Sequence, residues 1–528
     1  MARADLYCAV APFPERFNLC SYYLDRNLDE GRGGKVALVA GREKRTYAEV
    51  AARVRKLAAA LRRAGVRPEE RVLLVLPDRF EFPEAFFAVL RIGGVFAMVN
   101  PLLKREEYAY YLAYTKARVA LVHSDVLPEF TPAAEKARYL QEVLVVGPER
   151  GGFTAYEQTL AGEHDGSPRG ECEPTGPDDL AGWLFTSGST GKPKACVHTH
   201  ADFAWNTETY ALQVVRYAET DRCLSVPKLF FGYATGTNLM FPFRAGATSI
   251  LFEGRATADE LFDQLAAHHP TVLTSVPTMI NSMLRSPRME SANFKSLRVC
   301  LSAGEALPPK LYQEWKDRTG VEILDGIGSA EMFHIYISNR FGDVKAASLG
   351  KIVPGYEAEI VSEDGRAVPA GEPGLLRVRG GSTALCYWAD KAKSRATFQW
   401  EWCTSADLFR RDAAGYYYYE GRADDLLKVS GIFTSPLEIE NALLEHPAVA
   451  EVCVVGHDDE DGLTKPYAFV VLKAGQAGSE ALAAELKAWI KGKLAPHKYP
   501  RWFAWRNALP KNDRGKVARK ELREELAR

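Results

Sequence analysis

The chain lacks any large excess of charge of one sign. Its 528 residues include 67 Lys and Arg against 68 Asp and Glu, a net charge of −1. A dedicated nucleic-acid-binding protein carries a strong positive excess, so the composition argues against nucleic acid as a partner. The charge is unevenly distributed: residues 485–528 hold 13 basic and 5 acidic side chains, a net of +8. A basic C-terminal stretch therefore follows an acidic body.

Signals for export, membrane insertion and zinc binding are also missing. The first twenty residues include Arg3, Asp5 and Glu15 and no apolar core, so they do not resemble a secretory signal. The longest apolar stretch, residues 85–98, is interrupted by Arg91 and is too short to span a bilayer. Nine scattered cysteines without a Cys-x-x-Cys pair are typical of reduced thiols. We expect a cytoplasmic protein with no zinc site and no membrane partner.

What is present is an alternation of helix and strand patterns in a chain long enough for two or more domains. Thr46 and Glu49 form a predicted capping box that opens a helix to about Ala64. Helical patterns also cover 258–268 and 309–318. Buried strands are predicted at 71–76, 118–122, 142–147, 181–186, 222–227, 247–252, 271–275, 297–302 and 321–325. This alternation indicates α/β layers with mostly parallel sheets.

The pattern changes in the C-terminal part of the chain. Short strands separated by Gly/Pro turns predict a β-rich subdomain at about 349–419. A helix then begins at Ser435, which we expect to form a capping box with Glu438. Strands at 449–455 and 467–473 and a helix at 479–492 complete a small α+β unit. We place the boundary near 421–425, giving an N-terminal domain of residues 1–423 and a C-terminal domain of residues 424–528.

A stretch rich in glycine and hydroxyl residues follows a buried strand pattern at residues 184–194. Its glycines let consecutive N–H groups converge on an anion, and its hydroxyls and lysines add donors and positive charge. It is no Walker A loop, because Pro193 stands where that motif needs a hydroxyl. A solvated turn is the ordinary alternative, but the buried strand and the two lysines favour a phosphate-binding loop. The predicted contacts are Thr186, Ser187, Gly188, Ser189, Thr190, Gly191, Lys192 and Lys194.

Five segments in a fixed order resemble the motifs of the acyl-adenylate-forming enzymes, which include acyl-CoA synthetases, adenylation domains of peptide synthetases and luciferases. The first is the loop at 186–194. The others are 325–331 (Asp-Gly-Ile-Gly-Ser-Ala-Glu), 404–407 (Thr-Ser-Ala-Asp), 421–431 and 509–516. Segments 228–233 and 326–335 look most like those of benzoate-CoA ligases. The resemblance spans nearly the whole chain.

This resemblance implies a fold and a reaction. The fold would be a large N-terminal domain of two α/β subdomains plus a β-rich subdomain, followed by a small mobile α+β domain. The reaction would join a carboxylate to the α-phosphate of ATP and then transfer the acyl group to CoA, with Mg²⁺ as the metal. Because both reactants of the first step are anions, catalysis must neutralise charge and hold geometry. A homodimer is one assembly that we leave open.

The resemblance also assigns roles to residues around the nucleotide. Glu331 would bind Mg²⁺, Asp407 would accept hydrogen bonds from both ribose hydroxyls, and Arg422 would add a further contact. The ordinary alternatives are a helix-start carboxylate for the first and surface charges for the other two. Further nucleotide contacts would come from Gly304, Glu305, Ala306, Asp325, Gly326, Ile327 and Ala330.

The C-terminal motifs carry the catalytic and hinge assignments. Lys516 would bridge the attacking carboxylate and the α-phosphate, although it could also be one lysine among many in a basic tail. Asp424 would be the hinge about which the small domain turns after adenylation, the alternative being an ordinary linker. The turn would bring Lys428, Ser430 and Gly431 to the active site for the CoA step.

The acid would bind among aromatic and aliphatic side chains that suit a flat apolar ring. The residues that match the benzoate pocket are Phe231, Gly232, Tyr233, Gly328, His334 and Ile335. A lone histidine is more often a satisfied core residue, which is the alternative for His334. The small Gly232 leaves room for a ring substituent.

Three departures from the family pattern concern rate rather than reaction class. Ala330 replaces the usual Thr, Ser405 and Ala406 replace the usual Gly before Asp407, and Ala195 follows Lys194 where Gly is common. One lost transition-state hydrogen bond costs about 1–3 kcal/mol.

Two other functions stay open beside an aryl-CoA ligase. One is adenylation of an aliphatic or other acid, and the other is a nucleotide-binding homologue with impaired catalysis. The short chain after Lys516 disfavours a peptide-synthetase module.

Overall fold

The computed structural model describes residues 10–149, 151–164, 170–187, 192–362, 364–422, 427–429, 432–460, 463–495, 497–511 and 517–526. The chain divides into two compact units. The first comprises residues 1–307, 311–358 and 378–403, and the second comprises residues 308–310, 359–377 and 404–528. Each unit is described by itself below.

A nine-stranded sheet in the first unit has the order β16-β15-β14-β13-β12-β10-β11-β1-β2. Its central strands β14 to β1 are parallel, while β15, β16 and β2 are added antiparallel at the edges. The parallel strands are almost wholly buried, as expected for a sheet covered by helices on both faces. The bounds are β1 Val36–Ala40, β2 Glu43–Thr46, β10 Arg222–Ser225, β11 Thr248–Leu251, β12 Val272–Ser275, β13 Val299–Ser302, β14 Ile323–Gly328, β15 Ile335–Ser338 and β16 Lys351–Ile352.

An eight-stranded sheet in the same unit has the order β19-β9-β8-β4-β3-β5-β6-β7. Strands β8 to β7 in this order are parallel, and β9 and β19 are antiparallel additions. The mostly parallel sheets confirm the α/β class predicted from the sequence. The bounds are β3 Arg71–Val75, β4 Val95–Met98, β5 Val119–His123, β6 Glu142–Val146, β7 Thr154–Ala155, β8 Leu180–Ser187, β9 Pro193–Thr199 and β19 Cys386–Tyr387.

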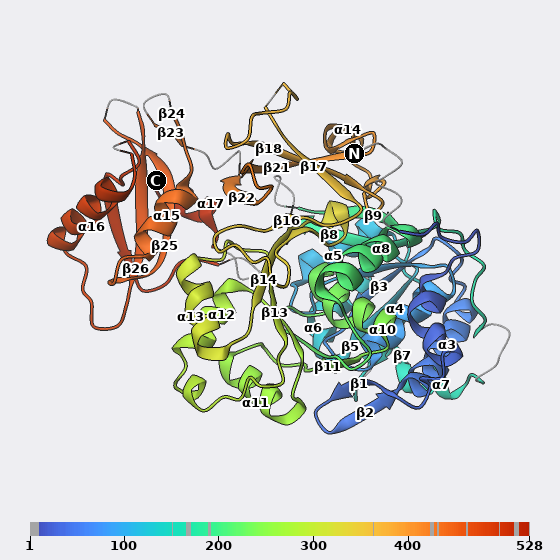
Figure 1. Cartoon of the computed structure of the whole chain (residues 1–528). Coiled ribbons are helices and arrows are strands. Elements are labelled where there is room, and N and C mark those ends of the chain that lie inside the picture. The colour runs from blue at the N-terminus through green and yellow to red at the C-terminus, as the bar shows by residue number, and fades with distance from the viewer. Residues whose placement is uncertain are drawn as a thin grey trace. The chain divides into compact units, whose positions relative to one another are not determined.

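Amphipathic helices cover these sheets. Helices α11, α12 and α13 lie together beside β13 and β14 (Figure 1), and their apolar faces bury Phe262, Ile280 and Trp315 in one core with the strands. On the eight-stranded sheet, α5 and α6 bury Tyr108 and Phe130. The bounds are α2 Arg26–Asp29, α3 Tyr47–Arg63, α4 Glu81–Arg91, α5 Arg105–Thr115, α6 Leu127–Ala134, α7 Tyr156–Ala161, α8 His200–Asn206, α9 Gly232–Thr235, α10 Phe241–Ala245, α11 Ala258–His268, α12 Pro277–Arg285, α13 Pro309–Thr319 and α14 Lys391–Thr397.

The predicted start of α3 is confirmed in detail. The Thr46 side chain accepts the Glu49 N–H, and the Glu49 carboxylate accepts the Thr46 N–H at 2.7 Å. This reciprocal capping box satisfies two backbone donors that an α-helix cannot pair internally.

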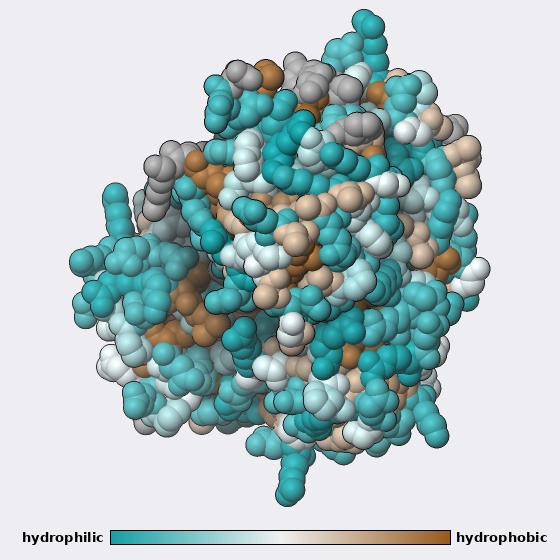
Figure 2. Space-filling view, turned by 90° about the vertical axis from the view of Figure 1, so that its left-hand side faces the viewer, coloured by the Kyte–Doolittle hydropathy of each residue, from teal (hydrophilic) through white to brown (hydrophobic). Residues whose placement is uncertain are grey.

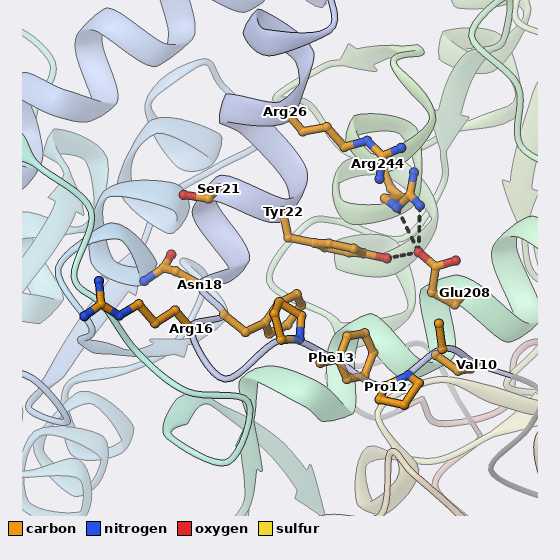
Figure 3. A pocket seen from close by; sticks show the side chains of 13 residues that line it. Val10, Pro12, Phe13, Arg16, Asn18, Ser21, Tyr22, Arg26, Glu208 and Arg244 are labelled. Carbon is orange, nitrogen blue, oxygen red and sulfur yellow. Dashed lines mark hydrogen bonds and ion pairs between the residues drawn. The ribbon is translucent and has the colours of Figure 1, made fainter.

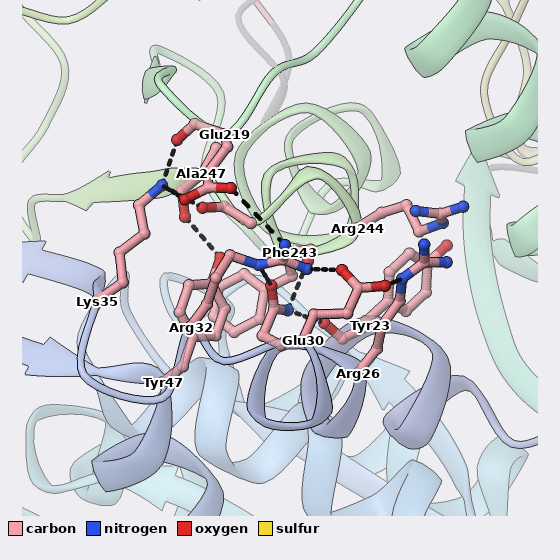
Figure 4. Close-up of polar contacts among 12 residues, drawn as sticks. Tyr23, Arg26, Glu30, Arg32, Lys35, Tyr47, Glu219, Phe243, Arg244 and Ala247 are labelled. Carbon is pink, nitrogen blue, oxygen red and sulfur yellow. Dashed lines mark hydrogen bonds and ion pairs between the residues drawn. The ribbon is translucent and has the colours of Figure 1, made fainter.

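Polar contacts tie the N-terminal segment to residues that border β11 (Figure 4). The Tyr47 hydroxyl donates to the Ala247 carbonyl at 2.6 Å. Lys35 Nζ donates to the Gly246 carbonyl at 2.5 Å and lies 3.6 Å from Glu219 Oε1. These contacts join segments about 200 positions apart, which explains how β1 and β2 come to complete a sheet made mainly of later strands.

A five-stranded sheet of order β17-β18-β21-β20, with β22 paired to β21, corresponds to the predicted β-rich region. The following part of the second unit contains a two-stranded and a three-stranded sheet, with α15 and α16 buried against the latter. The bounds are β17 Tyr356–Val361, β18 Gly374–Gly380, β20 Phe398–Gln399, β21 Trp402–Arg411, β22 Tyr417–Arg422, β23 Leu427–Val429, β24 Ile432–Thr434, β25 Val449–Asp458, β26 Thr464–Leu472, β27 Trp502–Arg506, α15 Pro436–Leu444, α16 Glu480–Lys493 and α17 Arg519–Leu526.

The predicted capping box at Ser435 is wrong. Helix α15 does begin with Pro436, but Ser435 makes no side-chain cap bond. Its hydroxyl donates to the Glu420 carbonyl instead. The Ser435 side chain is therefore held by a carbonyl outside the helix instead of accepting an N–H of the helix's first turn.

Hydrophilic residues cover most of the face seen in Figure 2, where hydrophobic residues form small separate patches. Within the described ranges, no helix is both long and apolar enough to cross a membrane.

Candidate active site

Two antiparallel strands flank the predicted phosphate loop and place its described ends opposite each other. Thr186 near the end of β8 pairs with Lys194 in β9, and Ser187 pairs with Pro193. Gly188, Ser189, Thr190 and Gly191 lie outside the described residues. The flanking hairpin thus fixes where the loop begins and ends, and it sets Lys194 beside Thr186.

Both lysines of this segment lie near aromatic rings. Lys192 Nζ is 5.6 Å from the centre of the Tyr110 ring, and Lys194 Nζ is 5.6 Å from the centre of the Tyr387 ring. Lys194 also lies 3.6 Å from a carboxylate oxygen of Asp390. A cation over an aromatic face is held without being neutralised, whereas the Asp390 carboxylate partly offsets the charge of Lys194.

The predicted metal ligand, Glu331, lies in a short helical turn (Ala330–Met332) after β14. The Tyr387 hydroxyl donates to Glu331 Oε1 at 2.7 Å, and the Ala384 N–H donates to the Glu331 carbonyl at 2.8 Å. Burial, and then the charge of Glu331, raise the pKa of Tyr387 well above its usual value, so the phenol stays protonated and donates. The carboxylate is therefore held in one orientation.

This carboxylate fits a magnesium ion that is shared with a nucleotide. Among the described residues no group of three or more His, Cys, Asp or Glu side chains is placed to hold a metal. Mg²⁺ at nucleotide sites takes one or two carboxylates and completes its shell with phosphate oxygens and water. Glu331, with one oxygen fixed by Tyr387, is a suitable donor of that kind.

A buried histidine holds the residue before Glu331. His198 Nε2 lies 2.7 Å from the Ala330 carbonyl, and His198 Nδ1 lies 2.8 Å from an oxygen of Asp202. Asp202 in turn accepts the Thr199 hydroxyl at 2.7 Å. The Ala330 backbone is thus fixed although its side chain lacks the hydroxyl that is usual at this position.

The segment predicted to line the adenine follows β13. Gly304 has φ +87°, the left-handed region that favours glycine. Glu305 accepts the N–H and the hydroxyl of Thr278 at 3.1 and 2.7 Å, at the start of α12. Both contacts use Glu305 Oε2 and turn this side chain towards α12. The backbone of residues 304–306, Ala306 included, stays the predicted contact of the adenine.

Asp325, Gly326 and Ile327 lie in β14. Asp325 ends the parallel pairing with β13, and the next two residues pair with the antiparallel strand β15. Burial raises the pKa of Asp325 to about 8, with the Ser302 side chain and the Gly326 N–H acting in the opposite direction. The carboxyl is therefore largely protonated at neutral pH. Its backbone carbonyl accepts the N–H of Asn339 at 3.0 Å.

Most of the predicted acid-pocket residues come together in the structure. His334 Nε2 lies 2.9 Å from the Tyr233 carbonyl, and the two rings are 5.3 Å apart. Gly328 pairs with Ile335 between β14 and β15, and a Cβ on Gly328 would lie 2.3 Å from the His334 carbonyl oxygen. Close backbone approach therefore requires glycine at 328.

The other two pocket residues lie at the start of α9, where Phe231 directly precedes the helix and Gly232 is its first residue. Gly232 faces Leu184 of β8 and Phe333, while Phe231 packs on Phe230 with ring centres 4.2 Å apart. Burial lowers the pKa of His334 to about 4, so its ring is neutral. Its contact with the Tyr233 carbonyl gives it the character of a core histidine, the ordinary alternative raised from the sequence.

In the second unit, two predicted ribose contacts are neighbours. Asp407 in β21 is directly opposite Arg422 in β22. The Ser405 hydroxyl accepts the Asp407 N–H at 3.1 Å. Lys428 lies in β23 opposite Phe433 of β24. Asp424, Ser430, Gly431 and Lys516 lie outside the described residues.

Comparison with known proteins matches this arrangement to one family. The model of the AMP-binding enzyme matches residues 24–388, and that of the AMP-binding enzyme C-terminal domain matches residues 438–516. The chain belongs to the AMP-binding enzyme family. The predicted adenylate-forming fold is thereby confirmed.

Several AMP-binding enzymes resemble the chain over nearly its full length. A benzoate–CoA ligase of Thauera aromatica is 44% identical over 97% of this chain and 96% of its own length. A 4-hydroxybenzoate–CoA/benzoate–CoA ligase of Rhodopseudomonas palustris is 39% identical over 96% and 94%. The solved structure of a benzoate CoA ligase from Burkholderia xenovorans has a TM-score of 0.89 at 43% identity, covering 96% of this chain and 100% of that one.

Sequence motifs of the AMP-binding enzymes did not reveal two contacts at the candidate site. Tyr387 and Glu331 are 56 positions apart, and His198 and Ala330 are 132 positions apart. Neither Tyr387 nor His198 belongs to any of the five motifs. Only the pairing of β9 with β8 and β19 brings them to the Glu331 turn.

A separate cavity of about 470 Å³ lies near the N-terminus (Figure 3). The Tyr22 hydroxyl and Arg244 Nε both donate to Glu208, the latter at 2.9 Å. Phe13 and Arg16 also line it. None of the residues predicted for the AMP-binding site lines this cavity.

Proposed function

We propose that the chain is an ATP-dependent aryl-CoA ligase that adenylates benzoate or a substituted benzoate and then transfers the acyl group to CoA. Pyrophosphate leaves in the first step and AMP in the second. The observation that carries the proposal is the 44% identity, over nearly the full length of both chains, with a benzoate–CoA ligase. The cluster of aromatic and glycine residues around His334 supports an aromatic acid.

Charge neutralisation is the main demand of the first step, because an acid anion must approach a triphosphate. Lys192, Lys194 and the loop between β8 and β9 hold the β- and γ-phosphates. Glu331 binds Mg²⁺, which when bound draws charge from the phosphate oxygens. Tyr387 keeps the Glu331 carboxylate in one orientation through its 2.7 Å hydrogen bond.

Lys516 supplies the remaining positive charge in the first step, between the acid carboxylate and the α-phosphate. Asp407 and Arg422 hold the ribose, which their cross-strand pairing supports. The small domain, residues 424–528, turns about Asp424 after adenylation. Lys428, Ser430 and Gly431 then serve the CoA step. The match of the C-terminal family model to residues 438–516 supports a separate C-terminal domain.

Among substituted benzoates, two buried polar atoms favour a ring with a polar substituent. The Tyr233 hydroxyl and His334 Nδ1 are both buried, and neither has a hydrogen-bond partner among the described residues. Since an unpaired buried polar atom costs free energy, a hydroxyl or amino group on the ring would stabilise this pocket. A solved anthranilate CoA ligase in complex with anthranoyl-AMP is 38% identical to this chain, with a TM-score of 0.92 over 97% of this chain and 98% of that one.

A panel of acids in the ATP–pyrophosphate exchange assay tests the proposal. We expect exchange with benzoate or with hydroxy- or aminobenzoates, and little with aliphatic acids of similar size. Exchange supported only by aliphatic acids would assign another substrate class. Tight ATP binding without acid-dependent exchange would show a nucleotide-binding homologue with impaired catalysis.

A cytoplasmic location and a homodimer complete the proposal. The scattered cysteines support the location, since a disulfide-rich framework is typical of exported proteins. Light scattering on the purified protein measures the assembly.

A further inference from the structure

A buried carboxylate joins the loops of the two large sheets beside the proposed acid pocket. Asp78 follows β3 of the eight-stranded sheet and is 2% exposed. Its Oδ1 accepts the N–H of Leu229, which follows β10 of the nine-stranded sheet, at 2.8 Å. Ligands of open α/β sheets bind at the carboxyl ends of parallel strands, where both residues lie.

The segment that Asp78 holds leads directly into the pocket. The Leu229 carbonyl accepts the Thr235 hydroxyl at 2.6 Å, and that hydroxyl also lies 3.0 Å from the Phe231 carbonyl. The Phe231 N–H donates to the Lys228 carbonyl at 2.9 Å. Both backbone groups of Leu229 are thus fixed by side chains, immediately before Phe231, Gly232 and Tyr233.

Lys228 precedes Leu229 in the chain and contacts Phe252, the residue after β11. Its Nζ donates to the Phe252 carbonyl at 2.6 Å and lies 3.3 Å from the centre of the Phe252 ring. Burial lowers the pKa of Lys228, while Asp78, Glu260 and Glu253 act to raise it. The lysine is therefore the counter-charge of Asp78 at this junction.

The charged groups near Asp78 and Lys228 come from several segments of the chain. Arg79 and Glu81 adjoin it in the chain, Lys228 faces it from the segment after β10, and Glu253 and Glu260 approach Lys228 from beyond β11 and from α11. Burial raises the pKa of Asp78 to about 6, and Lys228 and the Leu229 N–H act to lower it. The carboxyl consequently changes charge in a range that an enzyme assay can reach.

We propose that Asp78 is a positioning residue for acid binding, because its carboxylate fixes the segment 226–231 and so orders Phe231, Gly232 and Tyr233. This proposal rests on the proposed function. An ionised carboxylate accepts a hydrogen bond more strongly than a neutral one. The anchor is therefore strong above pH 6 and weakens as the pH falls through 6, and the acid KM rises in that direction.

The test compares the acid KM of the full chain and of Asp78→Asn from pH 5.5 to 8 in the exchange assay. Asparagine keeps the shape and an oxygen acceptor but carries no charge. At pH 8 we expect the variant KM for the acid to be about tenfold higher, with the KM for ATP unchanged. The difference should shrink towards pH 5.5, where the Asp78 carboxyl is mostly protonated and so resembles the neutral asparagine.

Two further variants separate positioning from a general loss of structure. Thr235→Val removes the hydroxyl that holds the Leu229 carbonyl, so it should raise the acid KM equally at every pH. Lys228→Met removes the counter-charge, so it should move the midpoint of the wild-type pH profile above 6. A ratio of Asp78→Asn to wild-type KM that is constant with pH, or a midpoint unmoved by Lys228→Met, would overturn the proposal.

Hydrogen exchange of the backbone N–H groups of residues 228–231 tests the anchor without any substrate. We expect faster exchange in Asp78→Asn than in wild type at pH 8, and unchanged exchange would also overturn the proposal. Because this measurement needs no acid, it still decides the role of Asp78 if no aromatic acid supports exchange, an outcome that would refute the proposed function alone.

Discussion

Replacing Tyr387 by phenylalanine tests how the Glu331 carboxylate is held. The change removes only the hydroxyl that donates to Glu331 Oε1 at 2.7 Å and keeps the ring that packs on Phe398, with ring centres 5.1 Å apart. A hydrogen bond to a charged group contributes about 1.5–3 kcal/mol. Because about 1.4 kcal/mol equals a factor of ten, we expect a loss of about 10- to 100-fold.

The loss should appear in the magnesium dependence of ATP–pyrophosphate exchange. Without the hydroxyl, the carboxylate samples more orientations, so half-saturation by Mg²⁺ should need a higher concentration and the maximal rate should fall. The KM for the acid should change little, since Tyr387 is not among the residues that gather around His334.

Tyr47→Phe is the matched control. The Tyr47 hydroxyl is buried and donates to the Ala247 carbonyl at 2.6 Å, so its removal also deletes one internal hydrogen bond. This variant should lose stability without changing the magnesium dependence. If Tyr387→Phe stays within about twofold of Tyr47→Phe at every Mg²⁺ concentration, the contact has only a structural role and the reasoning is refuted.

Four more predictions concern the reacting groups and the pocket walls. Lys516→Ala should abolish adenylation yet leave thioester formation from supplied acyl-adenylate largely intact, and equal loss of both half-reactions would contradict its role. Ala330→Thr should raise the exchange rate by about tenfold if the family hydroxyl contacts the α-phosphate, and an unchanged rate would show that it does not. Gly232→Ala should fold, since its Cβ would approach Leu184 no closer than 3.4 Å, and should lower kcat/KM for substituted benzoates more than for benzoate. Gly328→Ala should instead lower the free energy of unfolding by about 1–3 kcal/mol, measured by denaturant titration, because its Cβ would lie 2.3 Å from the His334 carbonyl oxygen.

Local structure was predictable wherever a short pattern decided it. The helix predicted at 258–268 has those bounds, and the one predicted at 309–318 ends one residue later. The capping box at Thr46 formed because its two partners are three residues apart. The one at Ser435 did not form, and the Ser435 hydroxyl instead donates to the Glu420 carbonyl, 15 residues away.

Strand order was not predictable, because it depends on pairings between distant segments. Leu38 pairs with Ser249, so β1 joins a sheet made of strands that begin near residue 222. Periodicity identifies a buried strand but does not identify its neighbour.

The residues of the candidate site likewise include some that the sequence predicted and some that it did not. The motif residues were found from their order along the chain, and the structure brings Gly232, Tyr233, Gly328 and His334 together. The groups that hold motif residues in place were missed, since Asp78 is 151 positions from Leu229 and lies in no motif. Residues that act through tertiary contacts have no fixed spacing along the chain, so no sequence motif identifies them.

The most direct test of the account is a product balance in one reaction. The purified chain is incubated with benzoate, ATP, Mg²⁺ and CoA, and benzoyl-CoA, AMP and pyrophosphate are quantified together by mass spectrometry and an enzymatic assay. The account predicts that the three products form in equal amounts and that none forms when benzoate or ATP is left out. Formation of ADP and phosphate in place of AMP and pyrophosphate, or AMP release without any aryl-CoA across the whole panel of aromatic acids, would contradict it.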